Sequence, residues 1–373
     1  MTQERAVATF FDLVRIDSPT FHEARVAEYC ADALTCLGFD VAVDGTEKVT
    51  GSDTGNLIAR LPGTAPGTRI ALSAHMDTVE PARGIEPVLG SDGVIRPAGP
   101  TILGADDKCG IAAILEALRR IVGRQQPHAA IQVILTVAEE VGLVGAKALD
   151  PSLINADLVL VLDADGDVGG IVVAAPTHFT FRAEFHGVAA HAGVSPEKGV
   201  SALAMAADAV SAMTLGRFDE RSTANIGTIT GGVATNVVAP DAVVTGECRS
   251  LDAERVEEIR GAMDAAMRQA AAKHGGSVDI AWVREYAGYS VEPDSPGYRL
   301  VEASCTDVGL AVRPYATGGG ADSNILAEAG VPVVALASGM RAVHSLDEHL
   351  RVADLELLVA LLEAIIGRAV AEA

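Results

Sequence analysis

The residues best suited to chemistry in this sequence are histidines and acidic residues that follow predicted β-strands. His75 and Asp77 come directly after the strand predicted at residues 69–74. Side chains two positions apart in an extended segment point to the same side, so Asp77 can accept the N–H of a metal-bound His75. A His-x-Asp sequence often has a purely structural origin, and it needs further ligands to indicate a metal site.

Two pairs of adjacent carboxylates occupy comparable positions. Asp106 and Asp107 lie in the sequence Gly-Ala-Asp-Asp-Lys-Cys-Gly at the start of the helix predicted at residues 107–122, where an aspartate can also simply cap the helix. Glu139 and Glu140 follow the apolar run Ile-Gln-Val-Ile-Leu-Thr-Val, and acidic residues are common in such loops. Each pair is therefore either structural or a source of metal ligands and of a general base.

A third acidic group and a late histidine complete the set. Asp163 directly follows the apolar segment Leu-Val-Leu-Val-Leu, with Asp165 and Asp167 close behind. Alternating aspartates could indicate calcium, but the glycine and the final glutamate of an EF-hand loop are missing. We choose Asp163 over Asp165 because it directly follows the strand. His344 follows a strand-like segment and a Ser-Gly turn, with His349 as second choice, and its ordinary interpretation is a loop histidine.

The five motifs together indicate a metal site, which no one of them indicates alone. In open α/β sheets, ligands bind at the carboxyl ends of the strands, where most of these side chains fall. Mixed imidazole and carboxylate ligands suit zinc, or cobalt and manganese where oxygen ligands dominate. Two ions about 3.5–4 Å apart can share a carboxylate and a water molecule, lower the pKa of that water and stabilise an oxyanion. A further carboxylate that is not a ligand must then accept the proton.

The segments around these motifs predict an α/β sheet. Apolar runs in the first half suit strands that are covered on both faces, and helices separate them. The predicted strands are 56–61, 69–74, 131–137 and 158–162, and the predicted helices are 2–16, 21–37 and 107–122.

A second pattern begins near Pro176. It has the order β-α-β-β-α-β, which is typical of an α+β sandwich. Its elements are predicted at 178–186, 199–214, 224–229, 243–248, 253–273 and 277–283. After Pro293 the helix–strand alternation returns, with a strand at 331–337 and a long final helix at 346–371. We therefore predict a two-domain protein, in which a mixed-sheet catalytic α/β domain (1–175 and 291–373) contains an inserted α+β sandwich domain (176–290).

Composition excludes several partners. The chain has 373 residues and a formal net charge of −22, from 28 basic and 50 acidic residues. Nucleic acid and anionic membranes require a basic surface, so we expect neither as a partner. No secretory signal opens the chain, and no apolar stretch is long enough to span a bilayer, which predicts a cytoplasmic location. Five cysteines without a CxxC pair predict reduced thiols rather than a disulfide framework.

The motifs at His75, Gly104 and Ala138, together with Asp163 and His344, resemble those of the M20 family of metallopeptidases. Within the family the resemblance is to peptidase T and peptidase T-like proteins, with similarity also to bacterial glutamate carboxypeptidase, and it runs over nearly the whole chain. It implies two divalent metal ions, zinc in the first place and manganese or cobalt as alternatives. The implied ligands are His75, Asp106 and Asp163 for one ion, and Asp106, Glu140 and His344 for the other.

The resemblance also assigns roles to residues that are not ligands. Glu139 would be the general base and then the general acid, and Asp77 would orient His75. The peptide bond between Asp106 and Asp107 would be cis.

The inserted domain would be a lid or dimerisation domain. His191, in His-Ala-Gly, would polarise the scissile carbonyl, often in the active site of a partner subunit. Asn236 and Arg249 would bind substrate, and an arginine can hold a carboxylate with two parallel hydrogen bonds. Gly319 lies in a glycine-rich turn whose N–H groups could bind an anionic end of the substrate, although an ordinary turn is nearly as good an interpretation.

The expected function is that of a metal-dependent exopeptidase, a homodimer that releases N-terminal residues from dipeptides or tripeptides. The alternatives are a carboxypeptidase or an N-acyl-amino-acid amidohydrolase of the same family, and a binding protein that keeps the fold without the chemistry. Arg249 would bind a free carboxylate in any of the enzymes, so it does not separate them.

Overall fold

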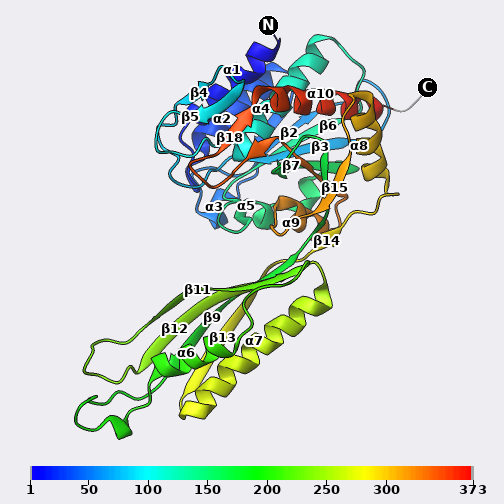
Figure 1. The fold of residues 1–373 in the computed structure, drawn as a ribbon. Coiled ribbons are helices and arrows are strands. Elements are labelled where there is room, and N and C mark those ends of the chain that lie inside the picture. The colour runs from blue at the N-terminus through cyan, green and yellow to red at the C-terminus, as the bar shows by residue number, and fades with distance from the viewer. Residues whose placement is uncertain (1, 371–373) are drawn as a thin grey trace. The chain divides into compact units, whose positions relative to one another are not determined.

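The computed structural model describes residues 2–370, which form two compact units (Figure 1). Unit 1 contains the chain up to Val173, residues Ser290–Ala316 and the chain from Ala321 onward. Unit 2 contains Ala174–Tyr289 and Thr317–Gly320.

Unit 1 is built around a large mixed sheet. Its strands are β1 (Asp40–Val43), β2 (Leu57–Leu61), β3 (Ile70–His75), β6 (Ile131–Thr136), β7 (Leu158–Ala164), β8 (Gly170–Ala175), β14 (Tyr289–Ser290), β15 (Arg313–Ala316) and β16 (Val333–Ala337). The order is β1-β2-β6-β3-β7-β16-β8-β14, and β15 also pairs with β8. The central strands β6, β3, β7 and β16 run parallel, so their carboxyl ends lie at one edge.

Helices cover both faces of this sheet, which explains why every residue of β3 and β6 is buried. The helices are α1 (Thr2–Arg15), α2 (Ala24–Cys36), α3 (Glu47–Thr50), α4 (Ala105–Gly123), α5 (Val144–Ala148), α8 (Pro296–Asp307), α9 (Asp322–Glu328) and α10 (Val352–Arg368), with a 3-10 turn at Pro151–Leu153. In Figure 1, α1, α4 and α10 lie on one side of the sheet and α5 and α9 on the other. A small antiparallel sheet joins β17 (Met340–Arg341), β18 (His349–Arg351), β5 (Val94–Pro97) and β4 (Pro87–Leu89) in that order.

Unit 2 is an antiparallel sheet with two helices packed on it. The strands are β10 (Gly216–Asp219), β11 (Ser222–Gly231), β12 (Asp241–Ser250), β9 (Thr177–His186) and β13 (Ser277–Tyr286), in that spatial order. The helices are α6 (Ala202–Ala212) and α7 (Ala253–His274), with a 3-10 turn at Pro196–Lys198. Phenylalanines at alternate positions of β9 form one core with apolar residues of both helices, as the alternation in the sequence predicts. The predicted combination of a mixed α/β sheet with a separate α+β sandwich is therefore confirmed.

Three predicted helices begin later than the sequence predicts. The helix predicted from residue 199 begins at Ala202, because Ser201 is extended and caps it by accepting the N–H of Ala204. The helix predicted from Phe21 begins at Ala24, because Phe21 adopts a positive φ of 73° and donates its N–H to the side chain of Glu23. The helix predicted from Leu346 begins at Val352, since residues 349–351 form β18 and pair with β5 and β17. Its predicted end, Ala371, lies outside the described residues.

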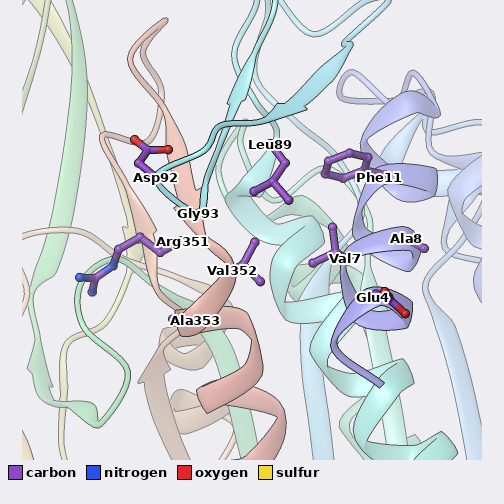
Figure 2. Close-up of a pocket in the computed structure, with 10 residues that line it drawn as sticks. All are labelled: Glu4, Val7, Ala8, Phe11, Leu89, Asp92, Gly93, Arg351, Val352 and Ala353. Carbon is purple, nitrogen blue, oxygen red and sulfur yellow. The ribbon is translucent and has the colours of Figure 1, made fainter. Parts of the chain in front are cut away.

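An apolar groove of about 660 Å³ lies between α1, the β4–β5 hairpin and the start of α10 (Figure 2). Val7, Phe11, Leu89 and Val352 face one another there, and Arg351 lies at the edge. None of the predicted metal ligands lines this groove, so it is not the site that the sequence motifs indicate.

Among residues 2–370, no helix combines the length and the apolar character that crossing a lipid bilayer requires. All five cysteines are free thiols, and four of them are buried. Burial raises the pKa of the Cys109 thiol well above its usual value, which argues against a nucleophile next to the Asp106–Asp107 motif.

Candidate metal centre

The first group of potential metal ligands contains His75, Asp106 and Asp163. His75 is the last residue of β3, and Asp163 lies near the end of β7, the parallel neighbour of β3. Asp106 is at the start of α4. Nε2 of His75 is 2.9 Å from Oδ1 of Asp106 and 3.9 Å from Oδ1 of Asp163. The three side chains therefore converge at the carboxyl edge of the large sheet.

The second group contains Asp106 again, with Glu140 and His344. Nε2 of His344 is 3.2 Å from Oδ2 of Asp106 and 2.9 Å from Oε2 of Glu140. Asp106 thus directs Oδ1 toward one histidine and Oδ2 toward the other. A carboxylate placed in this way can bridge two metal ions.

Both groups have dimensions that suit a metal ion. The ligand atoms within each group all lie within 4.8 Å of one another. In a tetrahedral site with bonds of about 2.0–2.1 Å, neighbouring ligand atoms are about 3.3 Å apart. The distances of 2.9, 3.2 and 3.9 Å lie on both sides of that value.

The charges at the centre also favour divalent cations. Burial and the neighbouring Asp106 raise the pKa of Asp163 well above its usual value. Burial and Asp163 do the same to the pKa of Asp107, whose Oδ1 has no hydrogen-bond partner among the described residues. Hydrogen bonds with Asp106 and Glu140 raise the pKa of His344 to about 10. A divalent cation would relieve this crowding, because it stabilises the ionised carboxylates and takes the place of the proton on the histidine.

Asp77 connects the histidine to the loop that follows β6. Its Oδ1 is 3.4 Å from Nδ1 of His75, and it also accepts the N–H of Glu139 at 2.9 Å. Its Oδ2 accepts the hydroxyl of Thr20 at 2.8 Å and the N–H of Glu140 at 3.3 Å. Burial alone would raise the pKa of Asp77, but His75 and these donors lower it, so it stays ionised. Asp77 therefore holds two loops as well as facing a ligand, which the sequence pattern did not indicate.

Glu139 lies beside the ligands but belongs to neither group. Its side chain is buried, with 8% of the residue exposed. Burial and the charge of Asp163 raise the pKa of Glu139 well above its usual value. A buried carboxylate that is not a ligand and has a raised pKa suits proton transfer.

The backbone close to Glu139 and Asp106 takes unusual conformations. Ala138 has a positive φ of 50°, and its N–H donates to Oε1 of Glu23 at 3.0 Å. The Asp106–Asp107 peptide bond is cis, as the resemblance implied. Gly104 precedes it with φ 70° in the left-handed region that glycine tolerates.

Several residues that support the ligands belong to no motif that is recognisable in the sequence. Glu23 holds the Ala138 turn, and buried Asp322 accepts the hydroxyl of Thr136, which pairs with His75 across β6 and β3. Glu348 binds the loop before Asp106. The spacing of Glu348 four residues after His344 is visible in the sequence, but its partners are backbone N–H groups that no side-chain motif reveals.

The alternative candidates lie outside both ligand groups. Asp165 is exposed, and its backbone oxygen accepts the hydroxyl of Tyr315. Asp167 pairs with Arg313 and Arg341. The ring of His349 contacts the backbone oxygen of Asp347 at 2.8 Å.

The substrate residues predicted in unit 2 fall into two places. His191 and Asn236 are exposed neighbours, since the residue after His191 donates its N–H to the backbone oxygen of Asn236 at 2.9 Å. They lie near Asp241, the first residue of β12, whereas Arg249 is near its other end. Eight residues of strand span about 26 Å. Within one chain, the structure therefore does not bring His191 and Asn236 together with Arg249.

Arg249 is held in a polar cluster. It donates to Glu247 at 2.8 Å and to the backbone oxygen of Gly318 at 3.3 Å, and its buried Nε has no partner among the described residues. His178 lies 2.8 Å from the same Glu247 oxygen. The N–H of Gly319 donates within its own turn, to the hydroxyl of Thr317 at 3.1 Å.

Comparisons with known proteins agree with this geometry. Residues 71–368 match the model of peptidase family M20/M25/M40. The structure of aminopeptidase PepT from Bacillus cereus ATCC 10987 superposes with a TM-score of 0.91 at 42% identity and covers 98% of both chains. That of a tripeptidase from Staphylococcus aureus subsp. aureus Mu50 gives a TM-score of 0.94 at 38% identity, again over 98% of both chains. Protein YqjE of Bacillus subtilis strain 168 is 41% identical over 97% of this chain and 99% of its own length. The chain is a peptidase of the M20/M25/M40 family.

Proposed function

We propose that this peptidase is a two-metal exopeptidase that releases N-terminal residues from dipeptides and tripeptides. The observation that carries the proposal is the sharing of Asp106 by two ligand groups, with the buried carboxylate of Glu139 beside them. The similarity to an aminopeptidase and to a tripeptidase supports the substrate class. We propose zinc as the metal because each group offers one imidazole and two carboxylates, with manganese and cobalt as alternatives.

The residues around the centre would divide the work of hydrolysis. The two groups that share Asp106 would hold two divalent ions, which would supply Lewis acidity at the reacting water and at the peptide carbonyl. Glu139 takes the proton from the attacking water and delivers it to the nitrogen of the leaving amine. Asp77 keeps His75 in place and holds the backbone of Glu139, so the base stays aligned with the ligands.

The end of the peptide that is recognised decides between the aminopeptidase and its alternatives. We expect that acetylation of the amine of a tripeptide lowers kcat/KM by about 10²-fold or more, because it removes the positive charge and the hydrogen-bond donors by which an aminopeptidase recognises the N-terminus. Amidation of the carboxylate should have a smaller effect. The measurement is the cleavage of three forms of one tripeptide (free, N-acetylated and C-amidated) by protein loaded with zinc, manganese or cobalt.

A larger effect of C-amidation than of N-acetylation on kcat/KM would favour a different activity within the family. If the acetylated peptide is cleaved as well as the free peptide, the aminopeptidase is ruled out. Preference for N-acyl-amino acids would then support the amidohydrolase, and loss of cleavage on amidation alone would support the carboxypeptidase.

We also propose that the enzyme is a homodimer in which unit 2 of each subunit contributes His191 to the active site of the other subunit. In one chain, His191 and Arg249 lie near opposite ends of β12. This separation is expected if His191 acts in the active site of the partner subunit. Nδ1 of His191 accepts the N–H of Gly193 at 3.1 Å, so a neutral ring carries its proton on Nε2 and can donate it to a carbonyl oxygen. Val194 and Val233 in the same unit are each 76% exposed, which suits a surface that a second subunit covers.

Mixing two inactive variants tests this arrangement. His191→Ala and Glu139→Gln, inactive alone, should regain about a quarter of wild-type activity after they are unfolded and refolded together. Half of the dimers are then hybrids, and each hybrid has one complete site. Activity is measured against each variant refolded by itself. If the mixture stays as inactive as its components while hybrid dimers form, His191 does not act across the interface.

The proposed location is the cytoplasm, where thiols stay reduced. The five free cysteines and the strongly acidic composition support it.

A further inference from the structure

The carboxylate of Glu348 is completely buried and accepts three backbone N–H groups of the loop that leads into α4. Its Oε2 accepts from Leu103 at 2.7 Å and from Gly104 at 2.8 Å, and its Oε1 accepts from Asp106 at 3.1 Å. Both oxygens are therefore committed to one short segment, and the last donor belongs to the shared ligand itself.

Only a carboxylate satisfies these three donors. A glutamine of the same shape offers one oxygen and one NH₂ group, so its NH₂ hydrogens would face at least one N–H of the loop. Burying a charge is unfavourable unless it is fully hydrogen-bonded, and an apolar side chain could fill the space at a lower cost. Packing alone does not explain a carboxylate at this position.

Glu348 also belongs to the segment that presents His344. Its own N–H donates to the backbone oxygen of Ser345 at 3.2 Å, which closes the turn that follows the histidine. One side chain thus ties the loop of His344 to the backbone nitrogen of Asp106, although the two ligands are far apart in the sequence.

The second ligand group depends more than the first on hydrogen bonds that hold its loops together. His75 and Asp163 lie on β3 and β7, which are neighbouring strands joined by sheet hydrogen bonds. His344 lies in a loop with φ 60° and a side chain that is 51% exposed, and Glu140 also follows its strand in a loop. The sheet therefore fixes two of the three ligands of the first group, whereas loops present two of the three ligands of the second.

We propose that Glu348 is a positioning residue that holds His344 and Asp106 at ligand distance, and so sets the affinity of the ion site formed by Asp106, Glu140 and His344. The proposal rests on the proposed two-metal function. Removal of this carboxylate weakens the second site much more than the site at His75, Asp106 and Asp163.

Titration of the metal-free protein with Co²⁺ tests the proposal, with calorimetry and the visible absorption of bound cobalt as readouts. In Glu348→Gln we expect the Kd of one ion to rise by about 10- to 100-fold, as for other residues that orient a ligand, and the Kd of the other ion to change by less than about 3-fold. At saturating Co²⁺, kcat should recover most of its value while the KM for a tripeptide stays close to that of the wild type.

Two further variants keep the test decisive. Glu348→Asp preserves the charge but is too short to reach all three donors, so it should show a smaller loss with the same asymmetry, and it replaces the glutamine variant if that one does not fold. Asp252→Asn is the matched control, because Asp252 accepts the N–H groups of Glu254 and Arg255 at the start of α7 and contacts no metal ligand. Its two Kd values should equal those of the wild type.

Equal shifts of both Kd values in the Glu348 variants, or no shift, overturn the proposal. A wild-type protein that binds fewer than two ions instead contradicts the two-metal function, so the two failures can be told apart.

Discussion

Replacement of Glu139 by glutamine is expected to lower kcat by roughly 10²- to 10⁴-fold while both metal ions remain bound. The amide keeps the shape of the side chain but cannot take a proton from water. Because Glu139 belongs to neither ligand group, the metal content should not change. The measurements are kcat on a tripeptide and metal content after dialysis.

The neighbouring Glu140→Gln variant is the matched control for this prediction. It makes the same chemical change one residue later, at a position 2.9 Å from Nε2 of His344. It should lose one ion and regain part of its activity when excess metal is added, whereas Glu139→Gln should not respond to metal. Full activity in Glu139→Gln would remove this residue from the mechanism, and loss of an ion would make it a ligand instead of a base. Retained binding of peptides without any hydrolysis by the wild type would favour the non-catalytic alternative.

The second large effect is expected from Asp106→Asn. One side chain lies 2.9 Å from Nε2 of His75 and 3.2 Å from Nε2 of His344, so one substitution should weaken both ion sites. Removal of a residue that only orients a ligand lowers metal affinity by about 10- to 100-fold. Removal of the shared ligand itself should lower the affinity for each ion by more than this. Activity should fall by about 10²-fold or more, to the level of wild-type protein treated with a chelator.

Asp165→Asn provides the comparison, because Asp165 is an exposed aspartate close to the centre but outside both ligand groups. Its metal content and kcat should match those of the wild type. Wild-type affinity for one ion in Asp106→Asn would mean that this aspartate does not bridge. Added zinc should restore the activity of the chelated wild type but not that of Asp106→Asn.

The sequence predicted the elements of this protein well where local patterns decide them. Phenylalanines at alternate positions of 178–186 predicted β9, and the all-apolar run before Glu139 predicted β6. The helix predicted from Leu346 failed for a reason that lies elsewhere in the chain. Residues 349–351 pair with β5 and β17, and an extended partner outweighs a local helical pattern.

For the metal centre too, only the features that depend on short-range sequence patterns could be predicted. The motifs around His75, Asp106 and Glu139 were recognisable because short-range spacing places them at strand ends and at a helix start. The choice of Asp163 over Asp165 used the end of a strand, and the structure places Asp163 within β7, which extends to Ala164 because Ala164 pairs with Ala337 of β16. The double role of Asp77 and the three donors to Glu348 involve backbone groups, so no side-chain pattern could show them.

By itself, the sequence determined which residues could bind metal, the family they indicate and the alternation of strands and helices, because these depend on residue type and on spacing within a few turns or strands. Only the tertiary structure decided that Asp106 faces both histidines, that His344 rather than His349 completes the second group, and that Glu348 ties two distant loops together. These relations join residues up to 245 positions apart. They depend on strand order and on the path of loops across the sheet edge, which long-range packing and backbone hydrogen bonds settle.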